Sequence, residues 1–273
     1  MARKFGLAPI HDVEGMTTAD HISLLKDVGF NGFFTRWDRD ETAKRRQAAD
    51  RCGITYQSIH APYEGVDAVW REGEAGDLFI NTLSDCLDDC KNNGIDIMVL
   101  HPYIGFNPPY IATDLGLDRF SRLVDRAVAR GVSLAFENVE GEEYLAALMA
   151  RFRTVPEVGF CLDTGHELCY NLGKDMLALY GDRLIHTHLN DNIGMTGEHI
   201  YWTDDLHLVP TDGKIDWQNL KERIDGTNYK GILMCELTLT NKPGKHTHDA
   251  YRAMKIEDFY AYALKKVRSA FGE

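Results

Sequence analysis

Short apolar runs alternate with amphipathic stretches along the whole chain, and the alternation repeats eight times. The apolar runs are rich in Val, Ile, Leu and Phe and are mostly continuous, as expected of parallel strands that are buried on both faces. The pattern predicts strands at residues 3–10, 32–36, 54–60, 95–101, 132–137, 158–163, 184–190 and 230–237. It predicts helices at residues 17–28, 40–51, 76–92, 114–130, 142–152, 174–182, 216–225 and 256–270.

Eight strand–helix units in one chain are typical of a (β/α)8 barrel, which we expect to form a single domain over residues 1–273. A glycine follows several predicted helices and precedes a strand, where a left-handed residue is favoured: Gly29, Gly53, Gly94 and Gly131. A doubly wound open sheet is the alternative fold. That fold normally carries a glycine-rich phosphate loop after its first strand, and neither G-x-G-x-x-G nor G-x-x-x-x-G-K-[ST] occurs here.

Composition narrows the class of protein. The chain has 273 residues and a formal net charge of −12, which disfavours a general polyanion binder but leaves room for a local basic groove. Its mean hydropathy is −0.32, and no apolar run approaches the roughly 18 residues that cross a bilayer. The six cysteines are scattered and no secretory signal is visible. We therefore expect a cytoplasmic protein without disulfides or a membrane span.

The ends of the predicted strands carry the candidate chemistry. In a barrel the strand-to-helix loops meet at one mouth, and here they are the long ones. Six successive strands end in a His, Asp or Glu: His60, His101, Glu137, Asp163, His188 and Glu236. Three further groups follow in the loops: His166, Asp205 and His207. Converging carboxylates repel one another unless a cation lies between them. Carboxylates mixed with imidazoles predict a divalent ion such as Zn²⁺, Mn²⁺ or Co²⁺.

Neighbours on the seventh strand receive different roles. His188 is nearer the mouth than His186 and is the better candidate ligand, while His186 is interpreted as a core or supporting group. Asp191 is expected to orient a neighbouring ligand. Aromatic residues in the mouth loops are candidates for a wall against which a sugar face packs: Trp37, Tyr63, Trp70, Tyr103, Phe106, Tyr201 and Trp202.

Basic residues are scarce in the mouth loops. Residues 191–213 contain no Lys or Arg, and residues 61–75 contain only Arg71 against four acidic residues. The exceptions are interpreted as a solvated rim: Arg36, Arg39, Lys242, Lys245 and Arg252. This distribution favours a small polyol over DNA as substrate, and no basic clamp for a phosphate group is evident.

Seven short motifs, in order along the chain, resemble one family. They are Ser58-Ile-His-Ala-Pro62, Leu100-His-Pro102, Phe136-Glu-Asn138, Leu162-Asp-Thr-Gly-His166, His188-Leu-Asn-Asp191, Asp205-Leu-His207 and Glu236. The chain resembles the xylose isomerase-like barrel superfamily of sugar isomerases and epimerases over essentially its whole length. The same superfamily contains the endonuclease IV type of DNA-repair enzyme.

The ketose epimerase branch of that superfamily implies one Mn²⁺-type ion, held by residues that match Glu137, Asp163, His188 and Glu236. The two glutamates of that set also pass a proton between the faces of the substrate carbon. His166 and Glu143 match positions that hydrogen-bond the sugar. This chain has Gly194 where that branch has an arginine.

The endonuclease IV branch implies three zinc ions. Nine positions of this chain match its ligands: His60, His101, Glu137, Asp163, His166, His188, Asp205, His207 and Glu236. A zinc-dependent phosphodiesterase acting on abasic DNA is therefore an alternative function.

From these observations we expect a metal-dependent isomerase or epimerase of a sugar or sugar phosphate. Glu137 and Glu236 would be its acid and base, acting through a metal-stabilised enediolate. The candidate substrate-binding residues are His166, Glu143, His60, His101, Trp37 and Tyr63. A related dehydratase and a non-catalytic metal-binding protein are further alternatives, and the resemblance suggests a homo-oligomer.

Overall fold

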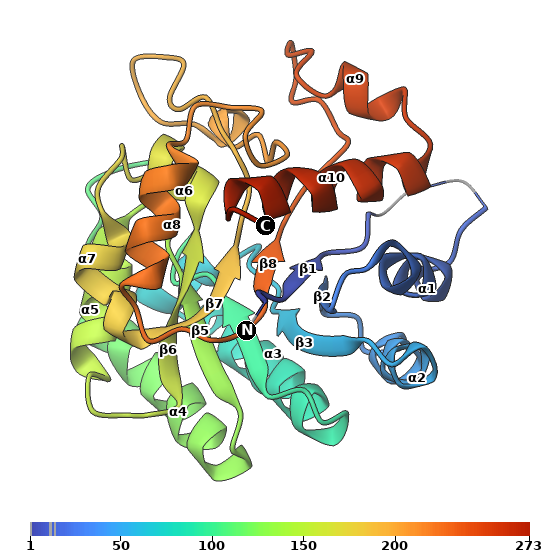
Figure 1. Cartoon of the computed structure of the whole chain (residues 1–273). Coiled ribbons are helices and arrows are strands. Elements are labelled where there is room, and N and C mark those ends of the chain that lie inside the picture. The colour runs from blue at the N-terminus through green and yellow to red at the C-terminus, as the bar shows by residue number, and fades with distance from the viewer. Residues whose placement is uncertain (1, 11–12, 14) are drawn as a thin grey trace.

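The computed structural model describes residues 2–10, 13 and 15–273, and its central feature is one sheet of eight parallel strands surrounded by helices (Figure 1). The strands are β1 (Phe5–Leu7), β2 (Gly32–Arg36), β3 (Thr55–His60), β4 (Ile97–Leu100), β5 (Ser133–Glu137), β6 (Val158–Asp163), β7 (Leu184–His188) and β8 (Leu233–Cys235). Their spatial order is β7-β6-β5-β4-β3-β2-β1-β8, so every strand except those at the seam lies beside its neighbours in sequence.

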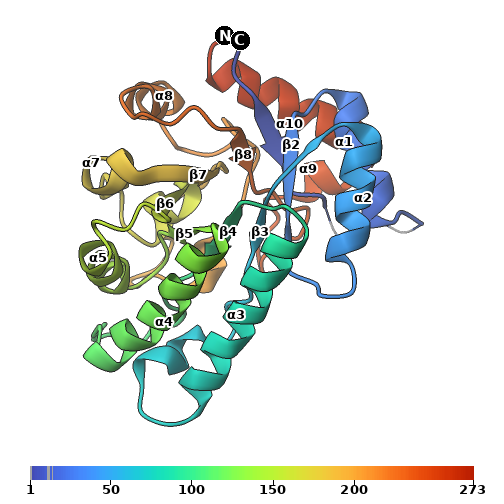
Figure 2. The ribbon, with the colours of Figure 1, turned by 90° about the horizontal axis from the view of Figure 1, so that it is seen from below.

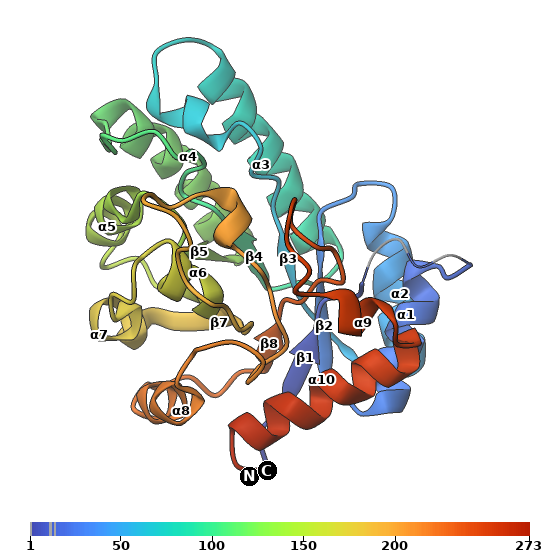
Figure 3. The same ribbon diagram turned by 90° about the horizontal axis from the view of Figure 1, so that it is seen from above.

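The helices form a ring outside the strands, as the views from below and above show (Figures 2 and 3). They are α1 (Thr18–Val28), α2 (Thr42–Cys52), α3 (Ala75–Asn92), α4 (Asp114–Arg130), α5 (Glu142–Arg151), α6 (Thr164–Cys169), α7 (Met176–Tyr180), α8 (Trp217–Asp225), α9 (Asp249–Arg252) and α10 (Ile256–Ala270). Three short 3-10 turns lie at Val66–Trp70, Gly181–Arg183 and Trp202–Asp204. The two ends of the chain lie side by side at the edge of the barrel (Figure 2), where the Arg3 amide donates to the Glu273 carboxylate.

Local sequence explains where these elements begin and end. Helix α1 begins with a capping box, in which the Thr17 hydroxyl accepts from the Asp20 amide and the Asp20 carboxylate accepts from the Thr17 amide. It ends at Gly29, which has a φ of 112°. Glycine adopts such a positive φ at little energetic cost because it has no side chain. The predicted elements are all present. Strands β1 and β8 are shorter than predicted, because only their central residues pair with neighbours.

The seam between β7 and β8 closes the sheet into a barrel. The Leu189 amide donates to the Met234 carbonyl at 2.7 Å, and the Glu236 amide donates to the Leu189 carbonyl at 3.2 Å. The Thr187 hydroxyl also exchanges hydrogen bonds with the backbone of Met234. These contacts confirm the predicted (β/α)8 barrel and exclude the open-sheet alternative.

Apolar residues fill two regions of the barrel. The larger region lies between the strands and the outer helices and includes Phe5, Phe33, Phe136 and Phe160, all with 1% or less of their surface exposed. The smaller region lies inside the strands and contains two clusters: Phe34, Ile232 and Met234, and Val99, Ala135 and Cys161. The residues two positions further along these strands are therefore carried to the mouth on the same inner face.

Within the described residues, no helix combines the length and apolar character needed to cross a membrane.

Candidate metal centre

The inner face of the barrel has a second layer, at the carboxyl ends of the strands. Because side chains on a strand alternate between faces, the residues two positions beyond the first inner layer point the same way. One residue from each strand, or directly after it, reaches this mouth ring: Ala8, Arg36, His60, His101, Glu137, Asp163, His188 and Glu236. Six of the eight are the predicted His, Asp and Glu positions, so the barrel brings them together.

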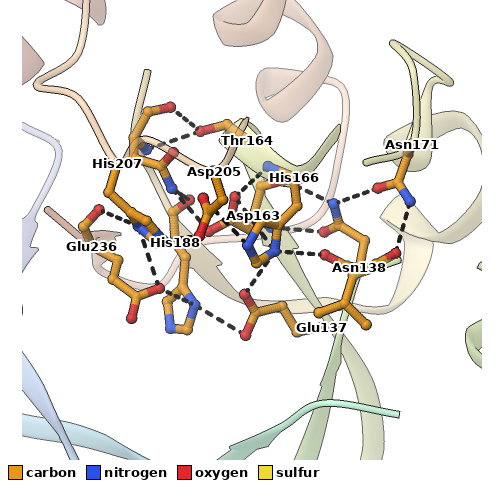
Figure 4. Close-up of polar contacts among 12 residues, drawn as sticks. Glu137, Asn138, Asp163, Thr164, His166, Asn171, His188, Asp205, His207 and Glu236 are labelled. Carbon is orange, nitrogen blue, oxygen red and sulfur yellow. Dashed lines mark hydrogen bonds and ion pairs between the residues drawn. The ribbon is translucent and has the colours of Figure 1, made fainter. Parts of the chain in front are cut away.

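Four members of the mouth ring form a compact group of possible ligands. Glu137, Asp163, His188 and Glu236 each offer one atom, and all these atoms lie within 4.8 Å of one another. Nδ1 of His188 is 3.2 Å from Oε2 of Glu137 and 3.2 Å from Oε2 of Glu236. Figure 4 shows the His188 ring between the two glutamates. Four oxygen and nitrogen donors at this spacing can surround one divalent cation.

Three further histidines surround the Glu137 carboxylate. Nε2 of His60 lies 3.3 Å from it, Nε2 of His101 lies 3.5 Å from it, and Nδ1 of His166 lies 3.4 Å from it. Glu137 itself has no exposed surface. The negative charge of this buried carboxylate is thus compensated by imidazoles on several sides. In such a site a metal cation can take the place of the protons that the carboxylate and imidazoles share.

A second possible ligand group adjoins the first. His166, Asp205 and His207 offer atoms within 4.8 Å of one another, with Nε2 of His207 only 2.8 Å from Oδ2 of Asp205. His207 also contacts the backbone carbonyl of Glu236, at 3.1 Å. Its φ of 51° is unusual for a residue with a side chain, so these contacts hold a conformation that the isolated chain would seldom adopt.

Unpartnered polar atoms test whether the residues fit a metal. Both Glu137 oxygens, both His188 ring nitrogens and Oδ1 of Asp205 are buried without a hydrogen-bond partner. Leaving such atoms unsatisfied costs about 1–3 kcal/mol each. A divalent cation would satisfy several of them at once, so the donor set fits a resident metal ion.

The charges of the clustered side chains also favour a bound cation. Burial opposes ionisation of Glu137, but the His188 and His101 side chains outweigh it and hold the pKa of Glu137 well below its usual range. Burial also opposes protonation of His188, yet Glu137 and Glu236 raise its pKa to about 9. Burial raises the pKa of Asp163 to about 6. The carboxylates of Glu137 and Glu236 therefore stabilise a positive charge on His188, which lies between them, where a bound metal ion would otherwise supply that charge.

Helix α6 and the loop after β7 fix the orientation of Asp163. Its Oδ1 accepts from the His166 amide at 2.7 Å and caps α6, while its Oδ2 accepts from the Asn190 side chain at 2.9 Å. Asn138 accepts from the Asp163 amide through its own side chain. A Cβ on Gly165 would lie 2.0 Å from the Asn190 amide oxygen, so this approach requires glycine.

Asp191 was expected from the sequence to orient a metal ligand, but it is the adjacent residue Asn190 whose side chain contacts the candidate ligand Asp163. Asp191 does not orient a ligand: its carboxylate accepts from the indole Nε1 of Trp217 at 2.7 Å and from the Asn192 and Ile215 amides. It ties the loop after β7 to α8. Asn190, for which the sequence suggested no role, donates from its side chain to the Asp163 carboxylate. His186 lies one layer below the mouth, where its ring contacts the Ser58 hydroxyl at 2.7 Å.

A cavity of about 640 Å³ opens above the candidate metal centre. Its walls include many of the candidate residues: His60, Tyr63, His101, His166, Trp202, Asp205, His207 and Glu236. Several predicted substrate contacts do not line it: Trp37, Trp70, Tyr103, Phe106, Tyr201 and Glu143. The Trp37 indole turns outward and donates to Asp89 of α3 at 2.8 Å, and Glu143 is exposed on α5. Arg36 and Lys242, interpreted from sequence as rim residues, do line the cavity.

Comparisons with known proteins agree with this architecture. The protein y4fM of Sinorhizobium fredii, described as uncharacterized, is 36% identical over 124 residues. That match covers 43% of this chain and spans well under half, 37%, of y4fM. The solved structure titled IOLI protein with a binding zinc atom has a TM-score of 0.76 and 16% identity, and covers 98% of both chains.

A second solved structure is D-psicose 3-epimerase from Clostridium cellulolyticum H10 with D-tagatose. It has a TM-score of 0.71 at 14% identity, over 98% of this chain and 99% of that one. At such identities the two structures show a shared fold. The sequence model of the family described as "Xylose isomerase-like TIM barrel" matches residues 22–256. The chain therefore belongs to the xylose isomerase-like TIM barrel family.

Proposed function

We propose that this protein is a divalent-metal-dependent isomerase or epimerase of a small sugar. The observation that carries the proposal is the pair of glutamates, Glu137 and Glu236, placed on either side of Nδ1 of His188 beneath a sugar-sized cavity. The family and the fold of a solved ketose epimerase support it. Glu137, Asp163, His188 and Glu236 would hold the ion, which polarises substrate oxygens and so acidifies the neighbouring C–H bond.

The two glutamates differ in their exposure to the cavity. Glu236 lines the cavity, with 17% of its side chain exposed, whereas Glu137 is fully buried. Glu236 is therefore the residue that we expect to take a proton from the substrate carbon. Its pKa lies below the usual range because His188 and His207 outweigh burial, so the carboxylate is ready to accept a proton at neutral pH. Glu137 is the second acid/base group of this proposal; because its carboxylate is buried and held ionised, it would first have to receive a proton from a neighbouring imidazole such as that of His60 before returning one to the carbon.

Aromatic and imidazole side chains would bind the sugar. Tyr63 stacks on His101 with ring centroids 4.5 Å apart, and both line the cavity. Trp202 contributes a further aromatic face. Flat rings of this kind cover the C–H face of a sugar, while the nearby imidazoles bond its hydroxyl groups. His60, His101 and His166 are the candidates for the latter role.

Solvent exchange tests the proposal. Protein loaded with Mn²⁺, Co²⁺ or Zn²⁺ is incubated in D₂O with a panel of ketopentoses, ketohexoses, their phosphate esters and their acids. Epimerisation or isomerisation places deuterium on the reacting carbon, which proton NMR detects. A product that has lost water would instead identify a dehydratase. Lack of exchange on every member of a broad panel, with metal bound, would contradict the proposal.

A zinc-dependent phosphodiesterase is the second candidate. The observation in its favour is that all nine matching residues lie in one connected network, because the second ligand group adjoins the first through the contact of His166 with Glu137. Two or three zinc ions per chain, with cleavage of abasic DNA, would favour this function over the first. One ion per chain without DNA cleavage would favour the sugar enzyme.

A further inference from the structure

Arg36 occupies the mouth ring beside the metal centre. It lies two residues after Phe34 on β2, and the Phe34 ring stacks on His188 with centroids 4.6 Å apart. Because side chains alternate along a strand, Arg36 is on the same inner face as Phe34, one layer nearer the mouth. It accordingly lines the cavity together with Tyr63 and Glu236.

The guanidinium of Arg36 forms no ion pair within the part of the chain that the structure describes. Its guanidinium carbon lies 5.5 Å from the centroid of the Tyr63 ring, and Glu236 and Glu64 act on its charge from beyond ion-pair distance. The other cation of the cavity wall is engaged: Nζ of Lys242 is 3.7 Å from Asp205. Arg39, three residues after Arg36, is paired with Asp85 outside the cavity.

An unpaired arginine in a concave site is suited to one kind of ligand. Its planar group presents several N–H donors in a fixed geometry that matches a carboxylate or a phosphate. Burial acts to lower the pKa of Arg36, but Tyr63, Glu236 and Glu64 outweigh it and raise the pKa, so the group stays charged. The carboxylates around Glu137 are matched by imidazoles, whereas Arg36 forms no ion pair with a described residue, so Arg36 is the candidate to stabilise an anionic group.

We propose that Arg36 binds an acidic group of the substrate, so that the enzyme acts on anionic sugars, either phosphate esters or sugar acids. This inference rests on the proposed function. The substrate would extend across the cavity with its reacting carbon at Glu236 and its acidic group at Arg36. A volume of about 640 Å³ falls within the range of small-molecule sites. The sequence alone placed Arg36 on a solvated rim; in the structure its side chain is exposed to solvent and also lines the cavity.

Binding calorimetry on the Mn²⁺-loaded protein tests this inference without requiring turnover. The probes are D-fructose, D-fructose 6-phosphate and D-fructuronate, which share a skeleton and differ in charge. We expect one of the two anionic sugars to bind at least about tenfold more tightly than D-fructose. In Arg36→Gln this preference should disappear while D-fructose binding is unchanged. Arg39→Gln, the matched control, should keep the preference. Which anion is preferred distinguishes a phosphate from a carboxylate substrate.

Two results would overturn the inference. One is that neither anionic sugar binds more tightly than D-fructose. The other is a preference that survives in Arg36→Gln, which would mean that the anion binds the metal ion or another residue. The proposed function has a separate readout: an Arg36-dependent preference without solvent exchange would count against the isomerase alone, and exchange on neutral sugars without a preference would count against the Arg36 inference alone.

Discussion

Oε2 of Glu236, from the end of β8, lies 3.2 Å from Nδ1 of His188 at the end of β7. This contact crosses the seam where the barrel closes, and the backbone hydrogen bonds of Leu189 hold the two strands in register there. The candidate base and a candidate metal ligand are thus positioned by the same closure of the sheet.

Replacement of Glu236 by Gln should remove catalysis and leave the fold intact. The amide keeps the shape of the side chain but cannot accept a proton, and loss of a general base lowers the rate by on the order of 10²–10⁴-fold. The measurement is deuterium incorporation by NMR with an active substrate, alongside metal content by elemental mass spectrometry. Glu198→Gln, an exposed change in the loop after β7, is the control. A Glu236→Gln rate within tenfold of the parent would refute the assignment.

Replacement of Asn190 by Ala should weaken metal binding. The Asn190 side chain donates to Asp163 in a buried position, and loss of a group that orients a ligand typically reduces metal affinity by about 10–100-fold. Calorimetric titration of metal-free protein with Mn²⁺ measures the change. Asn219→Ala on α8, an exposed position, should bind Mn²⁺ like the parent. Equal affinities for the two variants would show that Asn190 has no such role.

Metal removal should destabilise the protein. Metal at 100 times its dissociation constant should raise the free energy of unfolding by about 2.7 kcal/mol, which corresponds to roughly 5–10 °C in Tm for a chain of this size. Thermal unfolding with Mn²⁺ and after chelation measures the shift. His188→Asn, which removes a ligand from the centre, should show little shift. An equal shift in that variant would place the stabilising metal elsewhere.

Arg119 should prove important for stability rather than for catalysis. Its guanidinium donates to the carbonyls of Val69, Arg71 and Gly73 and to Asp77, and 5% of its side chain is exposed. Arg119→Met leaves these carbonyls and the carboxylate without their donor, so we expect a loss of about 3 kcal/mol or more.

Urea unfolding of Arg119→Met and of a matched variant measures that effect. Arg122 pairs with the same Asp77, but its side chain is 56% exposed, so Arg122→Met should cost less than about 1 kcal/mol. Similar losses for the two variants would show that the buried carbonyl contacts of Arg119 contribute little.

The order and type of the elements could be predicted from the sequence, because they depend on local signals. Continuous apolar runs indicate strands buried on both faces, and glycines such as Gly29 end the helices. The candidate metal ligands could be proposed on similar grounds: a carboxylate directly after apolar residues, as in Glu236, is costly to bury without a nearby cation. Parallel strands then bring such residues to one mouth.

The tertiary structure decided which way neighbouring side chains face. Arg36 and Trp37 are adjacent in sequence, yet one lines the cavity and the other bonds Asp89 on α3. Asn190 and Asp191 also face in different directions: the Asn190 side chain contacts Asp163, and the Asp191 carboxylate contacts Trp217. The reason is that pleating sends successive residues to opposite sides. The sequence by itself indicated the barrel and a set of candidate ligands, but which neighbour enters the site depended on the register of the assembled strands and loops.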